Sequence, residues 1–200
     1  MKIAILGGTF NPPHIGHLII GERAHSVLKL DRVFFIPANI PPIKGKFTEI
    51  GKHHRLKMTQ LATKDNPHFT VLDWELKRGG VSYTIDTVNE IRAKLSPTEI
   101  YLIMGWDQAQ IFDKWKDHNK LVELCKLIVF TRPGYESTLP AILKDNGKML
   151  PLYIDISSSM IRDMLMRGES IRYLVPNAVI SYIYKHKLYG VKGHDFFLAR

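Results

Sequence analysis

The stretch that decides the fold spans residues 7–17 and reads Gly7-Gly8-Thr9-Phe10-Asn11-Pro12-Pro13-His14-Ile15-Gly16-His17. The segment before it, Lys2-Ile3-Ala4-Ile5-Leu6, has the apolar run that is typical of a buried parallel strand. Apolar residues at helical spacing follow it, at Leu18, Ile19, Ala24, Val27 and Leu28. The order of strand, glycine-rich turn and helix predicts an α/β protein with a ligand site at the carboxyl end of the first strand.

The turn carries residue types that suit an anionic ligand. Paired glycines such as Gly7 and Gly8 let the backbone approach a bulky group such as a phosphate. His14 and His17 lie three residues apart at the expected helix start, so they share one face and can converge on one anion. Helix capping or a surface position is the structural alternative for either histidine. A zinc site at the pair is another alternative, although no clear third ligand accompanies it.

Strand-like and helix-like segments alternate along the rest of the chain. We expect strands over residues 32–37, 69–74, 99–105, 126–131 and 149–154, helices over 51–63, 84–95, 117–124, 158–166 and 176–186, and an exposed turn at 77–80. This alternation predicts a doubly wound parallel sheet with a helical C-terminal portion. One domain is expected over residues 1–189, followed by a tail at 190–200 for which the sequence indicates no role.

Composition restricts the class of protein. With 45% apolar and 24% charged residues, the chain has the composition of a globular protein. No apolar run reaches the ~18 residues of a membrane span, and Met1 leads directly into the first strand, which leaves no room for a signal peptide. The single cysteine, Cys125, rules out an internal disulfide framework and is expected in the core. We therefore expect a cytoplasmic protein with no membrane partner.

The net charge of +9 is compatible with two kinds of ligand. A basic protein can bind nucleic acid, and the same excess steers small polyanions such as nucleotides. The lysines and arginines are scattered, with no dense basic run and no module of interleaved basic and aromatic residues. We expect small-molecule substrates and no nucleic-acid partner. Whether the chain forms a homo-oligomer is left open by the sequence.

A second anion-binding segment is expected at Ile156-Ser157-Ser158-Ser159-Met160-Ile161-Arg162. Serines before a helix can simply cap it. The N-terminus of that helix also offers N–H groups and a positive dipole to a phosphate, and Arg162 lies one turn further on. The chain contains neither a Walker loop nor a G-x-G-x-x-G fingerprint, so a bound nucleotide triphosphate needs such a different device.

These segments resemble the nucleotidylyltransferase superfamily, whose signature T/S-x-F-D/N-P-x-H-x-G-H follows the first strand and whose I-S-S-T/S-x-I-R motif follows the last. The resemblance implies a Rossmann-like fold and an ATP site. Class I aminoacyl-tRNA synthetases share the H-x-G-H tetrapeptide, but this chain is short and has no K-M-S-K-S loop. The ATP-binding residues that the resemblance implies are Gly7, Gly8, Thr9, Phe10, His14, His17, Gly105, Asp107, Ile156, Ser157, Ser158 and Arg162.

Further segments resemble the bacterial nicotinate-mononucleotide adenylyltransferases within that superfamily. They are Pro37–Lys44, where Ile43 replaces the family's histidine, then Ser82-Tyr83-Thr84-Ile85-Asp86-Thr87, Gly105-Trp106-Asp107 with Trp115, and Arg132-Pro133-Gly134. Trp106 replaces a small alanine, with an effect on the pocket wall that is left open. A plain helix cap at Ser82–Thr87 and a core position for Trp115 are the structural alternatives. The resemblance implies acceptor-binding residues Asn39, Lys44, Ser82, Tyr83, Thr84, Trp115 and Arg132.

The resemblance implies transfer of AMP from ATP to nicotinate mononucleotide, giving nicotinate adenine dinucleotide and pyrophosphate in NAD biosynthesis. Catalysis would fall to His14, His17, Lys44 and Arg162, with Mg²⁺ held through the ATP phosphates and no metal site of the protein's own. A phosphate nucleophile is already ionised, so no general base is needed. The alternatives are an adenylyltransferase for nicotinamide mononucleotide or phosphopantetheine, and a non-catalytic nucleotide-responsive regulator.

Overall fold

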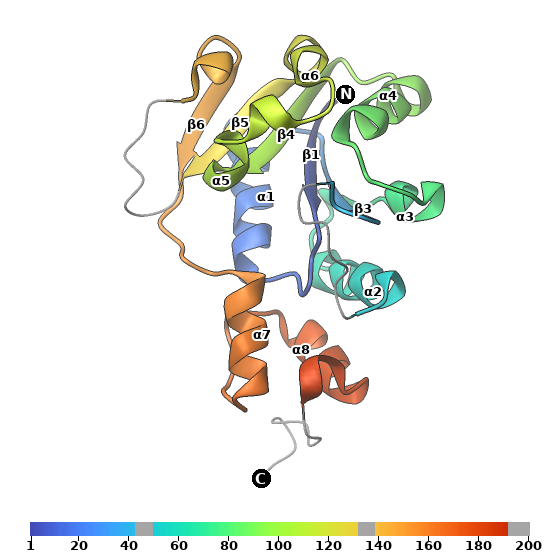
Figure 1. Ribbon diagram of the computed structural model, residues 1–200, viewed down its shortest axis with the longest axis vertical. Helices are drawn as coiled ribbons and strands as arrows, with labels where there is room; N and C mark the ends of the chain where they lie inside the picture. Colours follow the sequence, from blue (N-terminus) through green and yellow to red (C-terminus); the bar gives the residue numbers. More distant parts are fainter. Residues whose placement is uncertain (43–49, 132–138, 192–200) are drawn as a thin grey trace.

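The computed structural model describes residues 1–42, 50–131 and 139–191 (Figure 1). A six-stranded parallel sheet has the order β3-β2-β1-β4-β5-β6. This order confirms the predicted doubly wound sheet. Its strands are β1 (Lys2–Gly8), β2 (Arg32–Pro37), β3 (Phe69–Val71), β4 (Glu99–Gly105), β5 (Lys126–Thr131) and β6 (Gly147–Pro151).

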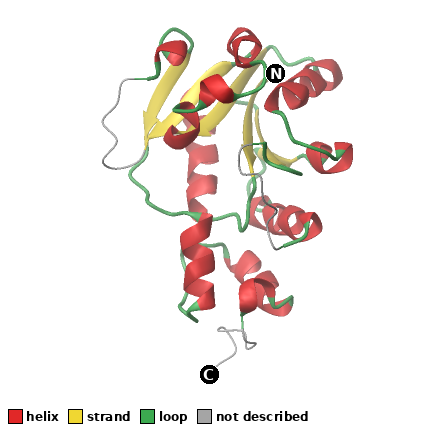
Figure 2. Ribbon diagram, viewed as in Figure 1, coloured by secondary structure: helices red, strands yellow, loops and turns green. Residues whose placement is uncertain are grey.

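Helices cover both faces of the sheet (Figure 2). They are α1 (Ile15–Leu28), α2 (Lys52–Thr63), α3 (Trp74–Arg78), α4 (Thr84–Leu95), α5 (Trp106–Ala109), α6 (His118–Leu124), α7 (Ser158–Met166) and α8 (Asn177–Lys185), with 3-10 turns η1 (Phe112–Lys114), η2 (Ala141–Leu143) and η3 (Leu188–Gly190). The chain winds outward from β1 in both directions, because β1 pairs with β2 on one side and β4 on the other. Such a switch point leaves a crevice at the carboxyl ends of the strands.

The alternation of side chains along β1 builds two cores. Ile3 and Ile5 pack on one face with Val88 and Ile91 of α4. The alternate residues of β1 pack on the opposite face, where Ala24 of α1 covers them. Successive side chains of a strand point to opposite faces, so an unbroken apolar strand needs helices on both sides.

A third apolar cluster lies beyond the sheet, where α2, α7 and α8 gather at the bottom of Figure 1. Met58 of α2, Ile161 of α7 and Ile183 of α8 are each completely buried in it. Val191, the last described residue, is also buried there, so the chain beyond residue 189 starts by packing on these helices. Residues 192–200, which make up the rest of the expected tail, lie outside the described residues. The cluster positions α7 opposite the carboxyl ends of the strands.

Two expected strands are present, but with bounds that differ from the expected ones. The strand expected over 69–74 ends at Val71, and Trp74 begins α3, which includes Lys77 and Arg78 of the expected turn. Asp73 precedes that helix, and its carboxylate lies 3.0 Å from Lys77 Nζ. The strand expected over 149–154 spans Gly147–Pro151. Proline has no N–H for the ladder, so pairing with β5 stops at Pro151 although apolar residues continue beyond it.

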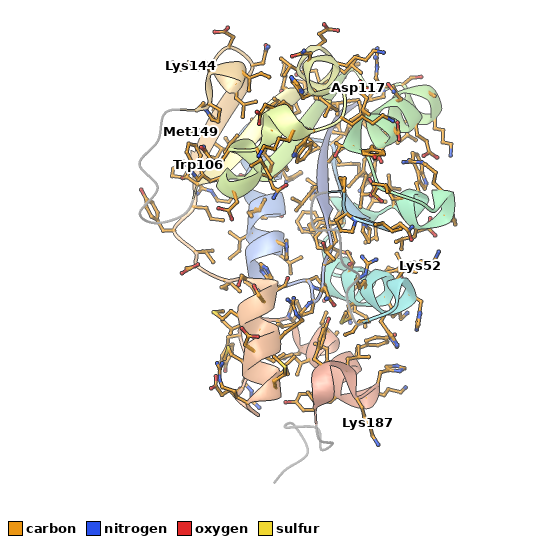
Figure 3. All side chains as sticks on the ribbon, viewed as in Figure 1. Lys52, Trp106, Asp117, Lys144, Met149 and Lys187 are labelled. Carbon is orange, nitrogen blue, oxygen red and sulfur yellow. The ribbon has the colours of Figure 1, made fainter. Side chains whose placement is uncertain are left out.

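Cys125 is buried in the core, as expected, and burial raises the pKa of its thiol to about 12. Trp106 is also a core residue and packs with Met149 nearby (Figure 3). Its ring therefore supports the sheet and does not line the crevice. Within the described ranges, we find no helix with the length and apolar character needed to cross a membrane.

Candidate active site

One cleft of about 1400 Å³ opens at the carboxyl ends of β1, β4 and β5. Its walls come from the loop after β1, the start of α4, the segment after β4 and the start of α7. The structure therefore brings together segments that are widely separated in the sequence. The residues expected at the site that line the cleft are Gly7, Gly8, Thr9, Phe10, His14, His17, Ser82, Tyr83, Thr84, Gly105, Asp107, Trp115, Ile156, Ser157, Ser158 and Arg162.

Two expected residues, Lys44 and Arg132, lie outside the described residues. Asn39 is described but does not line the cleft. Asn39 lies behind the wall, where its side-chain amide donates to Gly80 O at 2.8 Å and its backbone N–H donates to Ser82 Oγ at 2.8 Å. Asn39 therefore connects the end of β2 to the segment that leads into α4.

The loop after β1 turns sharply at Phe10. Its φ of 49° lies in the left-handed region, and its side chain is buried. A Cβ at Gly8 would lie 3.1 Å from the Phe10 ring, a tight contact that a larger residue could make only if the ring moved. The Phe10 ring contacts the His17 ring edge to face, with ring centroids 5.0 Å apart. Phe10 therefore supports His17 from below.

His14 and His17 form a pair at the start of α1. The backbone N–H of His14 donates to His17 Nδ1 at 3.2 Å, and the two ring centroids lie 3.7 Å apart. Because Nδ1 of His17 accepts a hydrogen bond, the ring proton is on Nε2, where it can be donated to a ligand. A Cβ at Gly16 would lie 3.0 Å from the His14 ring. The close approach gives a steric reason for a glycine between the two histidines of the H-x-G-H sequence.

The carbonyl groups of this loop are held from the helical side. Arg55 Nη1 donates to Thr9 O, Arg162 Nη1 to Asn11 O and Ser158 Oγ to Pro12 O, each at 2.8 Å. The Asn11 side chain is held as well, because the Tyr189 hydroxyl donates to Asn11 Oδ1 at 2.7 Å. These contacts bind the loop to α2, α7 and η3 and fix its position.

Arg55 connects the loop after β1 to the end of β2 and was not among the expected site residues. It is only 2% exposed, and its Nη2 donates to Asn39 O at 3.3 Å in addition to the bond to Thr9. Burial lowers the pKa of this guanidinium, although the nearby Tyr189 hydroxyl acts in the opposite direction. His54-Arg55 resembles the helix that follows the Pro37–Lys44 loop in the nicotinate-mononucleotide adenylyltransferases, and this sequence signal could have identified Arg55.

The start of α7 combines capping with an anion-binding geometry. Ser157 caps the helix, because its Oγ accepts from the N–H of Met160 at 3.2 Å. The N–H groups of Ser158 and Ser159 have no acceptor within the helix and lie at the positive end of its dipole. The capping alternative is therefore correct for Ser157, and it leaves an anion site beside Arg162.

The start of α4 forms the opposite end of the cleft. Tyr83 is the N-cap residue, and the N–H groups of Thr84 and Ile85 have no acceptor within the helix. Lys116 Nζ lies 4.6 Å from the Tyr83 ring centroid and 3.5 Å from an Asp86 oxygen. This end therefore offers helix N–H groups to a small anionic group, while the charge of Lys116 is shared with Asp86.

Trp115 lies next to that helix start. It is half-buried and contacts the Phe112 ring, with centroids 5.4 Å apart. Its indole Nε1 is buried and has no hydrogen-bond acceptor among the described residues. The half-buried indole lines this end of the cleft, where an aromatic surface can stack on a planar ring.

A protein-borne metal centre is not found within residues 1–42, 50–131 and 139–191. No group of three or more His, Cys, Asp or Glu side chains in these ranges could hold a metal ion. The zinc alternative at His14 and His17 thus has no third ligand there. Asp107, which is exposed at the cleft after β4, is one of the carboxylates that line it, together with Glu75 and Asp163.

Comparison with known sequences gives a consistent result. The cytidylyltransferase-like family model matches residues 5–164. The chain is 38% identical over 198 residues to a probable nicotinate-nucleotide adenylyltransferase of Dehalococcoides mccartyi, covering 94% of this chain and 97% of that protein. It is 44% identical over 195 residues to a probable nicotinate-nucleotide adenylyltransferase of Dictyoglomus thermophilum, covering 94% and 100%.

Solved structures share the fold. The chain superposes with a TM-score of 0.80 on the Plasmodium falciparum nicotinic acid mononucleotide adenylyltransferase complexed with NaAD. The match covers 96% of this chain and 98% of that one at 20% identity. The same enzyme complexed with APC gives a TM-score of 0.79. At this level of identity the likeness shows a common Rossmann-like fold.

Proposed function

The chain belongs to the nicotinate-nucleotide adenylyltransferase family, within the cytidylyltransferase-like proteins, and we propose that it transfers AMP from ATP to nicotinate mononucleotide. An oxygen of the acceptor's 5′-phosphate attacks the α-phosphorus of ATP. The bond between that phosphorus and the oxygen bridging it to the β-phosphorus breaks. The products are nicotinate adenine dinucleotide and pyrophosphate, as NAD biosynthesis requires.

The observation that carries this function is that both sets of motifs line one cleft. The loop after β1 and the start of α7 would hold the triphosphate. The start of α4 and Trp115 would hold the acceptor. Because the nucleophile is an ionised phosphate, the protein needs no general base and acts by alignment and charge stabilisation.

We propose specific roles for the residues at the triphosphate end. His17 Nε2–H donates to an oxygen of the reacting phosphates, and the backbone N–H of His14 holds the His17 ring through Nδ1. The N–H groups at the start of α7 and the Arg162 guanidinium bind the leaving pyrophosphate, on which negative charge develops. The bond from Arg162 Nη1 to Asn11 O sets the position of that guanidinium.

We propose Mg²⁺ as the metal that accompanies ATP. The ion supplies charge neutralisation between the phosphates when it is bound. The ion would be held mainly through the ATP phosphates, and Asp107, which lines the cleft, would be an oxygen ligand of the kind that Mg²⁺ prefers. The other oxygen ligands would come from the phosphates and water.

At the acceptor end we propose two contacts for nicotinate mononucleotide. The pyridine ring stacks on the indole of Trp115. Its carboxylate binds at the N-terminus of α4, near Tyr83 and Thr84, where helix N–H groups and Lys116 favour an anion. A neutral amide gains less from this positive end, so we expect nicotinamide mononucleotide to be the poorer acceptor.

The test is pyrophosphate release with ATP and Mg²⁺, with nicotinate mononucleotide, nicotinamide mononucleotide and phosphopantetheine compared at equal concentrations. We expect turnover with nicotinate mononucleotide to exceed the other two by more than tenfold. Preference for another acceptor would contradict the substrate assignment. Nucleotide binding without pyrophosphate release from any of the three would favour a non-catalytic regulator.

A further inference from the structure

A buried carboxylate stands behind the acceptor end of the cleft and has no part in the chemistry of AMP transfer. Glu75, the second residue of α3, is 7% exposed. It lines the cleft together with Ser82, Tyr83, Thr84 and Thr87. An acid at this place requires an explanation, because the neighbouring helix start is the expected binding place for another carboxylate.

The contacts of Glu75 fall on both sides of the turn that begins α4. Thr87, in the first turn of α4, donates its hydroxyl to Glu75 Oε1 at 2.6 Å. Ser82, which precedes the N-cap residue, lines the same part of the cleft, and its hydroxyl lowers the pKa of the Glu75 carboxyl. Because Ser82 Oγ accepts from the N–H of Asn39, its hydroxyl proton is available for Glu75. The carboxylate is thus bonded to Thr87 and lies beside Ser82, on the two sides of the turn that begins α4.

The network continues to a cation on its outer side. Arg78 donates to Thr87 Oγ1 at 3.4 Å and to Glu90 Oε2 at 2.5 Å. Glu90 in turn accepts from Lys94 on the exposed side of α4. Arg78 therefore compensates Glu90 directly and reaches Glu75 through Thr87.

The buried Glu75 carboxyl lowers the stability of the folded protein. Burial raises the pKa of its carboxyl, while the hydrogen bonds from Thr87 and Ser82 and the charge of Arg78 oppose the rise. A raised pKa means that ionised Glu75 destabilises the folded state at neutral pH. Space filling alone does not account for an acid at this position.

We propose that Glu75 is a positioning residue that sets acceptor specificity, by fixing the turn of Ser82 and Tyr83 so that the N–H groups of α4 face the acceptor's carboxylate. This inference depends on the proposed function. A carboxylate uses several of those N–H groups at once, whereas an amide brings its own N–H₂ and matches fewer of them. Loss of the fixed turn therefore harms the nicotinate acceptor more than the nicotinamide acceptor.

The test compares Glu75→Gln with wild type in steady-state kinetics. Glutamine keeps the size but offers a single acceptor oxygen and turns an N–H₂ group toward the other hydroxyl. We expect the KM for nicotinate mononucleotide to rise about tenfold. The KM for ATP and the KM for nicotinamide mononucleotide should each stay within about twofold. The melting temperature should not fall, because a buried charge is removed.

Two further variants make the test decisive. Thr87→Val keeps the shape and removes the hydroxyl that Glu75 accepts from, so it should reproduce the rise in acceptor KM even if Glu75→Gln fails to fold. Glu90→Gln is the matched control, because Glu90 also accepts from Arg78 but does not contact the turn. Its KM for nicotinate mononucleotide should equal that of wild type. Equal changes for both acceptors, or an unchanged KM for nicotinate mononucleotide, would overturn the proposal. Wild-type preference for another acceptor would instead overturn the proposed function.

Discussion

The two ends of the cleft are held in position by different kinds of contact. At the triphosphate end, donors of α2 and α7 bind backbone carbonyl oxygens of the loop after β1, as Arg55, Ser158 and Arg162 do. At the acceptor end, hydroxyl groups converge on the buried carboxylate of Glu75. Because these carbonyl oxygens already accept hydrogen bonds from the helices, the loop is left with its N–H groups and histidines to bind an anion. The acceptor end instead contains the Glu75 carboxylate close to where the carboxylate of nicotinate mononucleotide is proposed to bind. We infer that this arrangement serves selectivity between acceptors and not affinity for them.

Arg55 connects these two ends. Its guanidinium donates to Thr9 O at the triphosphate end and to Asn39 O, which lies behind the acceptor end. Asn39 in turn donates to Ser82, the neighbour of Glu75. The ends therefore share one polar chain, and the comparison can be tested by changes that affect one end at a time.

The largest effect is expected at the triphosphate end. His17→Ala removes the Nε2–H donor to the reacting phosphates, and kcat should fall by an amount equivalent to roughly 3–4 kcal/mol. The KM for nicotinate mononucleotide should hardly change. Single-turnover rates with both acceptors would measure this.

His25→Ala on the same helix is the matched control, because His25 stacks on His68 with centroids 3.9 Å apart and does not line the cleft. Its kcat should equal that of wild type. Full-speed turnover by His17→Ala would remove the catalytic assignment of this end.

The next effect is expected at the acceptor end. Trp115→Ala deletes the flat surface for the pyridine ring, and the KM for nicotinate mononucleotide should rise by an amount worth about 2 kcal/mol. The KM for ATP should stay unchanged. An equal loss for ATP would mean that the two ends are not separate.

A smaller effect should show how the loop is held. Tyr189→Phe removes the hydroxyl that donates to Asn11 Oδ1, leaves that buried oxygen without this donor, and should lower the free energy of unfolding by about 1–2 kcal/mol. We expect kcat to fall by roughly tenfold because the loop shifts, without a change in acceptor KM. Tyr182→Phe, in the same apolar cluster, is the control. A rise in acceptor KM for Tyr189→Phe would contradict the division between the ends.

The smallest effect is expected in the pH dependence of the free energy of unfolding, through His54 of α2. His54 Nδ1 lies 2.9 Å from the Tyr182 hydroxyl, and burial, His53 and His186 lower its pKa below 6.5. The unfolded chain therefore binds this proton more readily, so stability should fall as pH drops below 6.5. Urea unfolding at about pH 7.5 and about pH 5.5 should show a smaller loss for His54→Gln than for wild type. Equal losses would exclude His54 as a cause.

The sequence predicted well what is local. The motif from Gly7 to His17 is contiguous, and the strand, turn and helix it predicts are all present. Cys125 in the core and the helix over 84–95 are likewise confirmed. In each case a short contiguous segment contains both the sequence pattern and the structural feature that it predicts.

The sequence did not predict contacts between distant segments. Tyr189 and Asn11 are 178 residues apart, and nothing in either neighbourhood indicates that they meet. Glu75 falls between the strand expected over 69–74 and the turn expected at 77–80, because the sequence does not show that β3 ends at Val71. Its burial and its bond to Thr87 depend on how α3 folds back against α4, which periodicity does not encode.

The most direct measurement is a crystal structure of this protein with nicotinate adenine dinucleotide bound. The account predicts the pyridine ring against Trp115, its carboxylate at the start of α4, and the bridging phosphates beside His17 and the start of α7. A dinucleotide bound in the reverse direction, or a pyridine carboxylate away from α4, would contradict the division of the cleft on which the account depends.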